Sequence, residues 1–200
     1  MSNLPLALPA DLEPALVRAI DPQGKLVAAL DALGPLAGKD VLVADADGGP
    51  FVEGIQAAGA RLVHAALAAP LRLEVPDASV DVVIGLWSAF RGVAARELAE
   101  VDRALRPEGR LLVVHDYGRD DLGRLRGDQP EYGAWSHRSG PFLTGGFRVR
   151  VVHCFWEFAS LDEAGAFLGA AFGAPGAALA ATLKRPRLSW NVAIYHRTRP

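Results

Sequence analysis

The sequence predicts an α/β fold built around a mostly parallel sheet, and two observations indicate it. First, three short runs are continuously apolar, as strands buried on both faces are: VLVAD (41–45), DVVIGLW (81–87) and RLLVVHD (110–116). Second, segments with helical spacing follow two of these runs, at 50–59 and 93–109. Because strands that alternate with helices pair in parallel, we expect helices on both faces of the sheet.

The other elements follow from residue period and turn residues. Pro50 suits the first turn of the helix at 50–59 and Gly59 its end, while Ser160 and Glu163 form a capping box. The expected order is helices at 11–20 and 24–34, a strand at 41–45, a helix at 50–59, strands at 61–67 and 81–87, a helix at 93–109, strands at 110–116 and 147–158, a helix at 160–173 and a strand at 189–197.

One domain spans residues 1–200, since no linker, repeat or low-complexity block interrupts the chain. It divides into N-terminal helices (1–37), a core (38–118), a loop or lid (119–146) and C-terminal strands and helices (147–200). The stretch at 131–147 is rich in glycine and aromatic residues, with His137 and Arg138 placed to meet an anion. It is interpreted either as a lid or partner surface, or as a solvated loop packed by its own aromatics.

Composition excludes several classes of protein. Half of the 200 residues are hydrophobic and 22% are charged, yet no apolar run approaches the ~20 residues that span a bilayer, so no membrane contact is expected. The single cysteine, Cys154, permits no internal disulfide or Cys/His metal cluster, and the N-terminus has no basic flank, so a cytoplasmic protein without metal is predicted. Basic residues cluster only in KRPR (184–187), too little for a nucleic-acid surface.

Two segments carry a family resemblance. LEVPDASVDVVIG (73–85) followed by RELAEVDRALRPEGRLLVVHDYG (96–118) resembles the class I S-adenosylmethionine (SAM) dependent methyltransferases, in particular the type 11 group, and WNVAIYHR fits that family's closing hairpin. The resemblance covers roughly residues 38–120. It implies a Rossmann-like three-layer sandwich with a C-terminal antiparallel strand, and SAM lying across the carboxyl ends of the first strands.

The resemblance places a glycine-rich cofactor loop at residues 45–49, and this chain departs from it. The glycine positions fall on Asp45, Asp47 and Gly49, with Gly48 adjacent. The loop acid falls on Val43, and the acids for ribose and adenine fall on Ala66 and near Ala69. Asp45 and Asp47 either cap the following helix from within the chain or attract the positive charges of SAM.

The connection between the second and third strands is short. Only residues 67–80 separate them, whereas a crossover alone takes about a dozen or more. We therefore expect the edge helix, the edge strand or both to be lost, which would remove a wall of the adenosine pocket. An apolar edge left there favours a homodimer or a protein partner.

The candidate site residues stand at the carboxyl ends of strands, where open α/β sheets place ligands. His115, Asp116 and Tyr117 are the catalytic candidates. Either His115 is a general base oriented by a carboxylate, or all three residues form hydrogen bonds with backbone groups where the strand ends. Trp87, with Ser88 beside it, either stacks on a planar ligand or fills a shrunken pocket. The cofactor-binding candidates are Asp45, Asp47, Gly48, Gly49, Trp87 and Ser88.

Two functions remain open. The first is a methyltransferase-like pseudoenzyme with an eroded SAM site, acting as a binding or interaction protein. The alternative is an active SAM-dependent methyltransferase on a small-molecule acceptor. A short-chain reductase is disfavoured because the residues four after Tyr117, Tyr132 and Tyr195 are Asp121, Ser136 and Arg199, so its Tyr-x-x-x-Lys pair is missing.

Overall fold

The computed structural model describes residues 4–6, 8–44, 48–63, 67–68, 72–87, 90, 93–127 and 130–199. The helices are α1 (Glu13–Ala19), α2 (Lys25–Leu33), α3 (Pro50–Ala57), α4 (Ala95–Ala104), α5 (Asp121–Arg126), α6 (Pro130–Ser136), α7 (Pro141–Thr144) and α8 (Leu161–Ala180). The strands are β1 (Asp40–Ala44), β2 (Arg61–Val63), β3 (Leu67–Ala68), β4 (Arg72–Leu73), β5 (Val80–Leu86), β6 (Leu105–Asp116), β7 (Arg148–Glu157) and β8 (Arg187–Thr198). Within these ranges, no helix combines the length and apolar character that crossing a bilayer requires.

Six of the strands form one sheet in the order β2-β1-β5-β6-β8-β7. β2, β1, β5 and β6 pair in parallel, and β8 runs antiparallel between β6 and β7. The predicted mostly parallel sheet with a C-terminal antiparallel strand is confirmed. Because the parallel strands all end at one edge, side chains that follow β1, β5 and β6 gather there.

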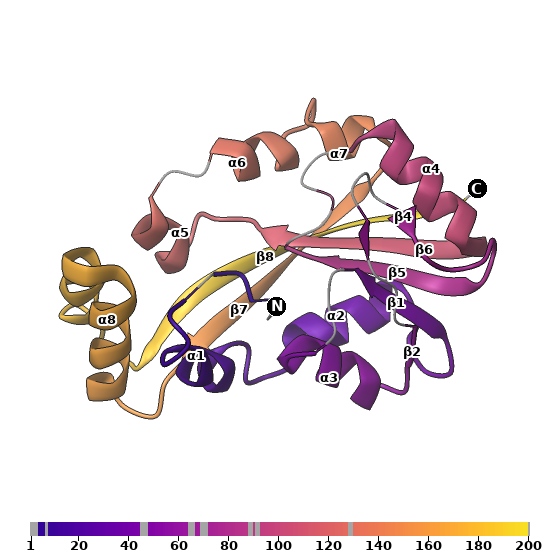
Figure 1. Ribbon diagram of the computed structural model, residues 1–200. Coiled ribbons are helices and arrows are strands. Elements are labelled where there is room, and N and C mark those ends of the chain that lie inside the picture. Colours follow the sequence, from indigo (N-terminus) through magenta and orange to yellow (C-terminus); the bar gives the residue numbers. More distant parts are fainter. Residues whose placement is uncertain are drawn as a thin grey trace.

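Helices cover both faces of the sheet, which gives the predicted three layers (Figure 1). α1, α2 and α3 lie on one face, α4, α6 and α7 on the other, and α8 stands beyond the carboxyl ends of the parallel strands. Alternation along the strands divides the core accordingly: Val43 and Ile84 join the cluster with α1 to α3, whereas Leu42 and Val83 join the cluster with α4.

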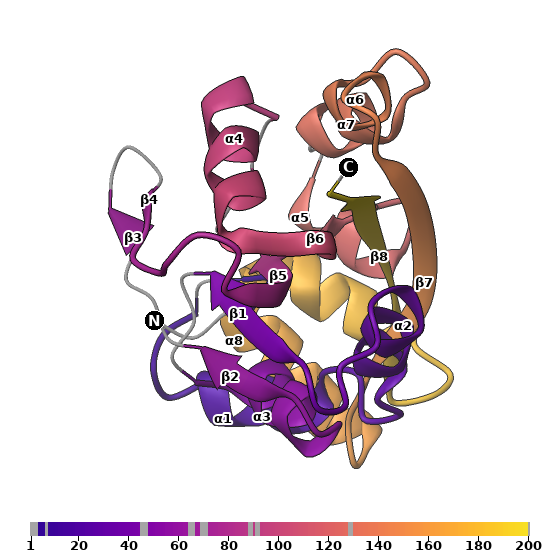
Figure 2. The ribbon, with the colours of Figure 1, turned by 90° about the vertical axis from the view of Figure 1, so that its right-hand side faces the viewer.

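The predicted shortening lies at the β2 edge. Between β2 and β5, the described residues contain only β3 and β4, an antiparallel pair that stands apart from the main sheet (Figure 2). Arg103 of α4 ties this pair to the core, donating to the carbonyls of Leu73 and Val75 at 2.8 Å each. The described part of this connection therefore has neither a crossover helix nor a further strand of the main sheet.

The segment expected as a loop or lid at 119–146 contains three short helices. The Asp120 side chain caps α5 by accepting from the amide of Gly123, and Pro141 opens α7 at a position where proline is favoured. α8 is also longer than the predicted 160–173, because the helix resumes after a kink at Gly173, whose φ is 61°. The sequence prediction ended this helix at Gly173 and could not show that helix continues beyond it.

Candidate functional site

A cavity of about 460 Å³ opens at the carboxyl end of β6. Its wall is the turn that leaves β6, the helix α5, the start of α6 and one residue of β8. The lining residues are Asp116, Tyr117, Gly118, Arg119, Asp120, Leu122, Gly123, Arg124, Arg126, Gly127, Tyr132, Gly133 and Trp190. Two of the predicted catalytic candidates, Asp116 and Tyr117, are among them.

Asp116 joins the cavity to the aromatic core beneath it. The indole N–H groups of Trp87 and Trp190 both donate to Asp116 Oδ1, at 3.1 and 3.0 Å, and Arg126 forms an ion pair with Oδ2. Only 5% of Asp116 is exposed, and this burial raises the pKa of its carboxyl group, against the opposing effect of Arg126. Such a buried acid needs all of these partners.

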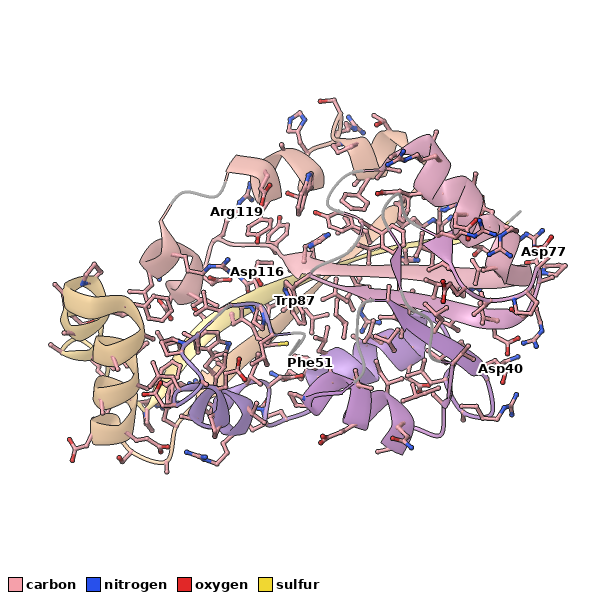
Figure 3. The ribbon with its side chains drawn as sticks, in the orientation of Figure 1. Asp40, Phe51, Asp77, Trp87, Asp116 and Arg119 are labelled. Atoms are coloured by element: carbon pink, nitrogen blue, oxygen red, sulfur yellow. The ribbon has the colours of Figure 1, made fainter. Side chains whose placement is uncertain are left out.

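The turn after β6 is held in an uncommon conformation. Gly118 has φ 73°, and the following Arg119 has φ 59°, which few non-glycine residues adopt. Asn191 of β8 stabilises the turn by donating from its side-chain amide to the carbonyl of Gly118 (3.2 Å). The Arg119 guanidinium consequently lies over the ring of Tyr117, 5.6 Å from its centroid, at the rim of the cavity (Figure 3).

The structure separates His115 from Asp116. The imidazole is fully buried on the other face of the sheet, 4.5 Å from the ring of Trp135, and its Nε2 lies 3.1 Å from the carbonyl oxygen of Phe90. Successive residues of a strand point to opposite faces, so Asp116 does not orient this ring. A catalytic role for His115 stays a prediction, and His115 is not among the residues that line the β6 cavity.

Three aromatic rings pack together near the carboxyl ends of β1 and β5. Trp87 follows β5 with a left-handed φ of 54° and stacks on Trp190, with centroids 5.8 Å apart. Phe51 from the first turn of α3 packs 5.3 Å from Trp87 (Figure 3). Trp87 and Phe51 are 6% and 4% exposed, and all three rings belong to the core cluster that also contains residues of α1 to α3.

The glycine loop is described only in part. Gly49 begins α3 with φ 103°, a conformation that requires glycine, and at both Gly48 and Gly49 an added Cβ would meet nothing within 4 Å. Asp45, Asp47 and Ser88, which are also predicted to bind cofactor, lie outside the described residues. Among the residues that are described, no three His, Cys, Asp or Glu side chains gather as metal ligands.

Arg119, Arg126 and Trp190 belong to the site but were not among the predicted residues. Arg126 comes from α5 and Trp190 from antiparallel β8, so both depend on tertiary contacts that local spacing does not encode. Arg119 did leave a signal, because it follows Tyr117-Gly118 at the end of a central strand, where ligand-binding turns occur.

Solved structures with the same fold are known, although no protein-family model and no curated protein matches the sequence. A candidate type II methyltransferase from Anaeromyxobacter dehalogenans aligns with a TM-score of 0.54 at 20% identity, over 87% of this chain and 95% of that one. A SAM-dependent methyltransferase from Aquifex aeolicus aligns with a TM-score of 0.51 at 15% identity, over 96% and 98%. The chain therefore has the fold of the class I SAM-dependent methyltransferases.

Proposed function

We propose that this protein is a methyltransferase-like binding protein that holds a small molecule in the β6 cavity and no longer uses SAM. The observation that carries the proposal is the buried ring cluster of Phe51, Trp87 and Trp190 across the strand ends. The β6 cavity suits a small molecule, because its volume of about 460 Å³ falls within the ~300–1,000 Å³ of typical small-molecule pockets.

The ring cluster and the cavity share one acid, which supports a division of roles. Asp116 fixes both indoles through their N–H groups and also lines the cavity. Moving Trp87 to admit a cofactor would break its bond to Asp116 and its stacking on Trp190. Because an unpaired buried polar group is costly, the closed arrangement is favoured.

Calorimetric titration with SAM and with S-adenosylhomocysteine tests this proposal. No heat of binding at millimolar ligand is expected from protein that shows a cooperative thermal transition, and neither compound should raise the melting temperature. Binding in the micromolar range would overturn the proposal.

The second candidate is a SAM-dependent methyltransferase acting on a small molecule. It is favoured by the open backbone at Gly48 and Gly49, since glycines there allow close approach of a ligand. If SAM binds, Asp47→Gly separates the two interpretations of the loop. Preserved or stronger binding means that the carboxylate only caps the helix, whereas a tenfold or greater loss means that it contacts the cofactor.

A homodimer or protein partner at the shortened β2 edge is a separate part of the proposal. β2 pairs with β1 through three residues, Arg61 to Val63, and is a terminal strand of the main sheet. Size-exclusion chromatography with light scattering is expected to give twice the 21.2 kDa chain mass. A clean monomer at high protein concentration counts against the dimer.

A further inference from the structure

The walls of the β6 cavity are suited to a flat ligand. Tyr117, Tyr132 and Trp190 contribute aromatic rings, and Leu122 adds an apolar side chain. Tyr132 is held by edge-on packing against Trp135, at 5.3 Å between centroids, and Trp190 by its contacts with Trp87 and Asp116. Tyr132 and Trp190 are 6% and 0% exposed and form the buried backing of the wall, whereas the half-buried Tyr117 ring is the aromatic surface open to a ligand.

Both acids in the wall are already satisfied by the protein. Asp120 accepts from the backbone N–H groups of Gly123 and Asn191, each at 2.6 Å. Asp116 accepts from two indoles and pairs with Arg126. Burial also raises the pKa of both carboxyl groups, which disfavours their negatively charged form. Neither acid is thus arranged as an anchor for a cationic ligand.

The arginines are arranged differently. Within the described residues, no carboxylate pairs with Arg119, whose guanidinium lies over the face of the Tyr117 ring. Arg126 uses Nη1 for Asp116, and a guanidinium carries five N–H donors, more than that one oxygen can accept. Arg124, on the exposed side, pairs with Asp121. The cavity therefore presents positive charge beside aromatic surface.

The strain at the rim supports a role for Arg119. Left-handed non-glycine residues are sparsely populated because they cost stability, and they concentrate at ligand sites. Arg119, Trp87 and Phe90 all have this conformation, with φ of 59°, 54° and 57°. Trp87 directly follows the end of β5, and Arg119 stands in the turn that leaves β6. Glycine would relieve the strain at position 119, so a guanidinium there has a use that offsets it.

We propose that the β6 cavity binds a planar aromatic compound bearing an acidic group, carboxylate or phosphate, with Arg119 as the main contact to the anion. The planar fork of arginine matches both groups, and the apolar wall beside Tyr117 holds the aromatic part. This inference deepens the proposed function and rests on it only in placing the ligand in the same cavity.

Calorimetric titration with four single-ring probes tests the charge requirement. 4-Hydroxybenzoate and phenyl phosphate are expected to bind, and whichever binds at least tenfold more tightly identifies the acidic group. Benzylamine and benzyl alcohol, the cationic and neutral probes, are expected to bind at least tenfold more weakly than the better acid. Equal binding of benzylamine, or no binding of either acid at 10 mM, overturns the proposal.

Two charge-matched variants assign the contact. Arg119→Gln is expected to weaken the better acid at least tenfold, while Arg96→Gln, on the exposed surface of α4, removes the same charge and leaves the affinity unchanged. Equal losses in both variants would show a general charge effect and overturn the assignment to Arg119. SAM is titrated separately: if SAM binds while the acids behave as expected, the proposed function fails and the ligand class stands.

Discussion

The two ends of the parallel sheet treat their acids in opposite ways. At the amino end, Asp40 bonds to Arg61 and Arg106, and these arginines lower the pKa of its carboxyl group. At the carboxyl end, burial raises the pKa of Asp116 and Asp120 (Figure 3 labels Asp40 and Asp116 at the two ends). The arginines at the amino end favour the charged form of Asp40, whereas burial at the carboxyl end disfavours the charged forms of Asp116 and Asp120.

The same contrast holds for the backbone. Glu108 has a left-handed φ of 64° and lies at the amino end of β6, where the register with β5 shifts and the side chain meets solvent. The left-handed φ of 59° at Arg119 places a guanidinium at the rim of a cavity. Strain at the carboxyl end is therefore joined to buried charge and to a binding-sized space, and this combination is typical of functional sites.

Truncating the acid at each end gives the largest expected difference. Asp116→Ala leaves Arg126 without its partner and two buried indoles without an acceptor, so we expect a loss of about 3–5 kcal/mol in the free energy of unfolding. The Asp40 carboxylate forms its ion pairs at the surface, so Asp40→Ala should lower the free energy of unfolding much less. Urea denaturation measures both variants. Equal losses would mean that the two ends do not differ in this way.

The tether of the β3–β4 pair gives an intermediate effect. Arg103→Met keeps the side-chain length but removes the donors to the carbonyls of Leu73 and Val75. Since a hydrogen bond from a charged group contributes about 1.5–3 kcal/mol, local opening should increase, with amide hydrogen exchange at residues 72–75 rising about tenfold or more. Arg96→Met on the same helix is the control, and exchange that rises equally in both variants would contradict the assignment.

The sequence predicted the sheet because its signals are local. Continuous apolar runs mark the buried strands, and the shortness of the 67–80 connection predicts that an edge helix or strand is lost. It also placed Asp116, Tyr117 and Trp87 at the carboxyl edge of the sheet, since the end of a strand is visible in the chain itself. By contrast, the contacts of Arg126 and Trp190 with Asp116 depend on how α5 and β8 pack, which is not encoded in spacing.

The sequence itself argues against His115 and Asp116 acting together. His115 and Asp116 are consecutive in a strand, so their side chains must leave on opposite faces. The structure accordingly places His115 against Trp135 and Asp116 against Trp87 and Trp190. Alternation therefore argues against a pair of neighbouring strand residues acting on one substrate, whatever their chemistry.

Relieving the backbone at each end tests whether strain is linked to binding. Arg119→Gly and Glu108→Gly each place glycine at a position with a left-handed φ, which glycine adopts without strain. Each substitution should therefore raise the free energy of unfolding by about 1 kcal/mol. Only Arg119→Gly should also lose affinity for the aromatic acid. Thermal unfolding and calorimetry separate the two effects. If Arg119→Gly binds as the unaltered protein does, the strain at the rim serves no ligand.

The dependence of stability on pH is the smallest expected effect, because Arg126 opposes the burial of Asp116. The folded pKa of Asp116 lies above its ordinary value of 3.8, so between those two values the folded protein holds more protons than the unfolded chain. Raising the pH through this window lowers the free energy of unfolding. Asp116→Asn should reduce that slope, with Asp21 and Asp120, whose pKa values are also raised, supplying the remainder.

Asp40 has the opposite sign and is the control. Its folded pKa lies below 3.8, so it stabilises the protein above that pH, and the contribution is lost as the pH falls through the folded value. Asp40→Asn should therefore alter the profile only below about pH 4, and Asp116→Asn only above it. Urea denaturation from pH 3 to pH 7 resolves the two windows. A slope in Asp116→Asn that matches the unaltered protein above pH 4 would mean that Arg126 fully offsets burial, and the acids at the two ends would then differ in exposure alone.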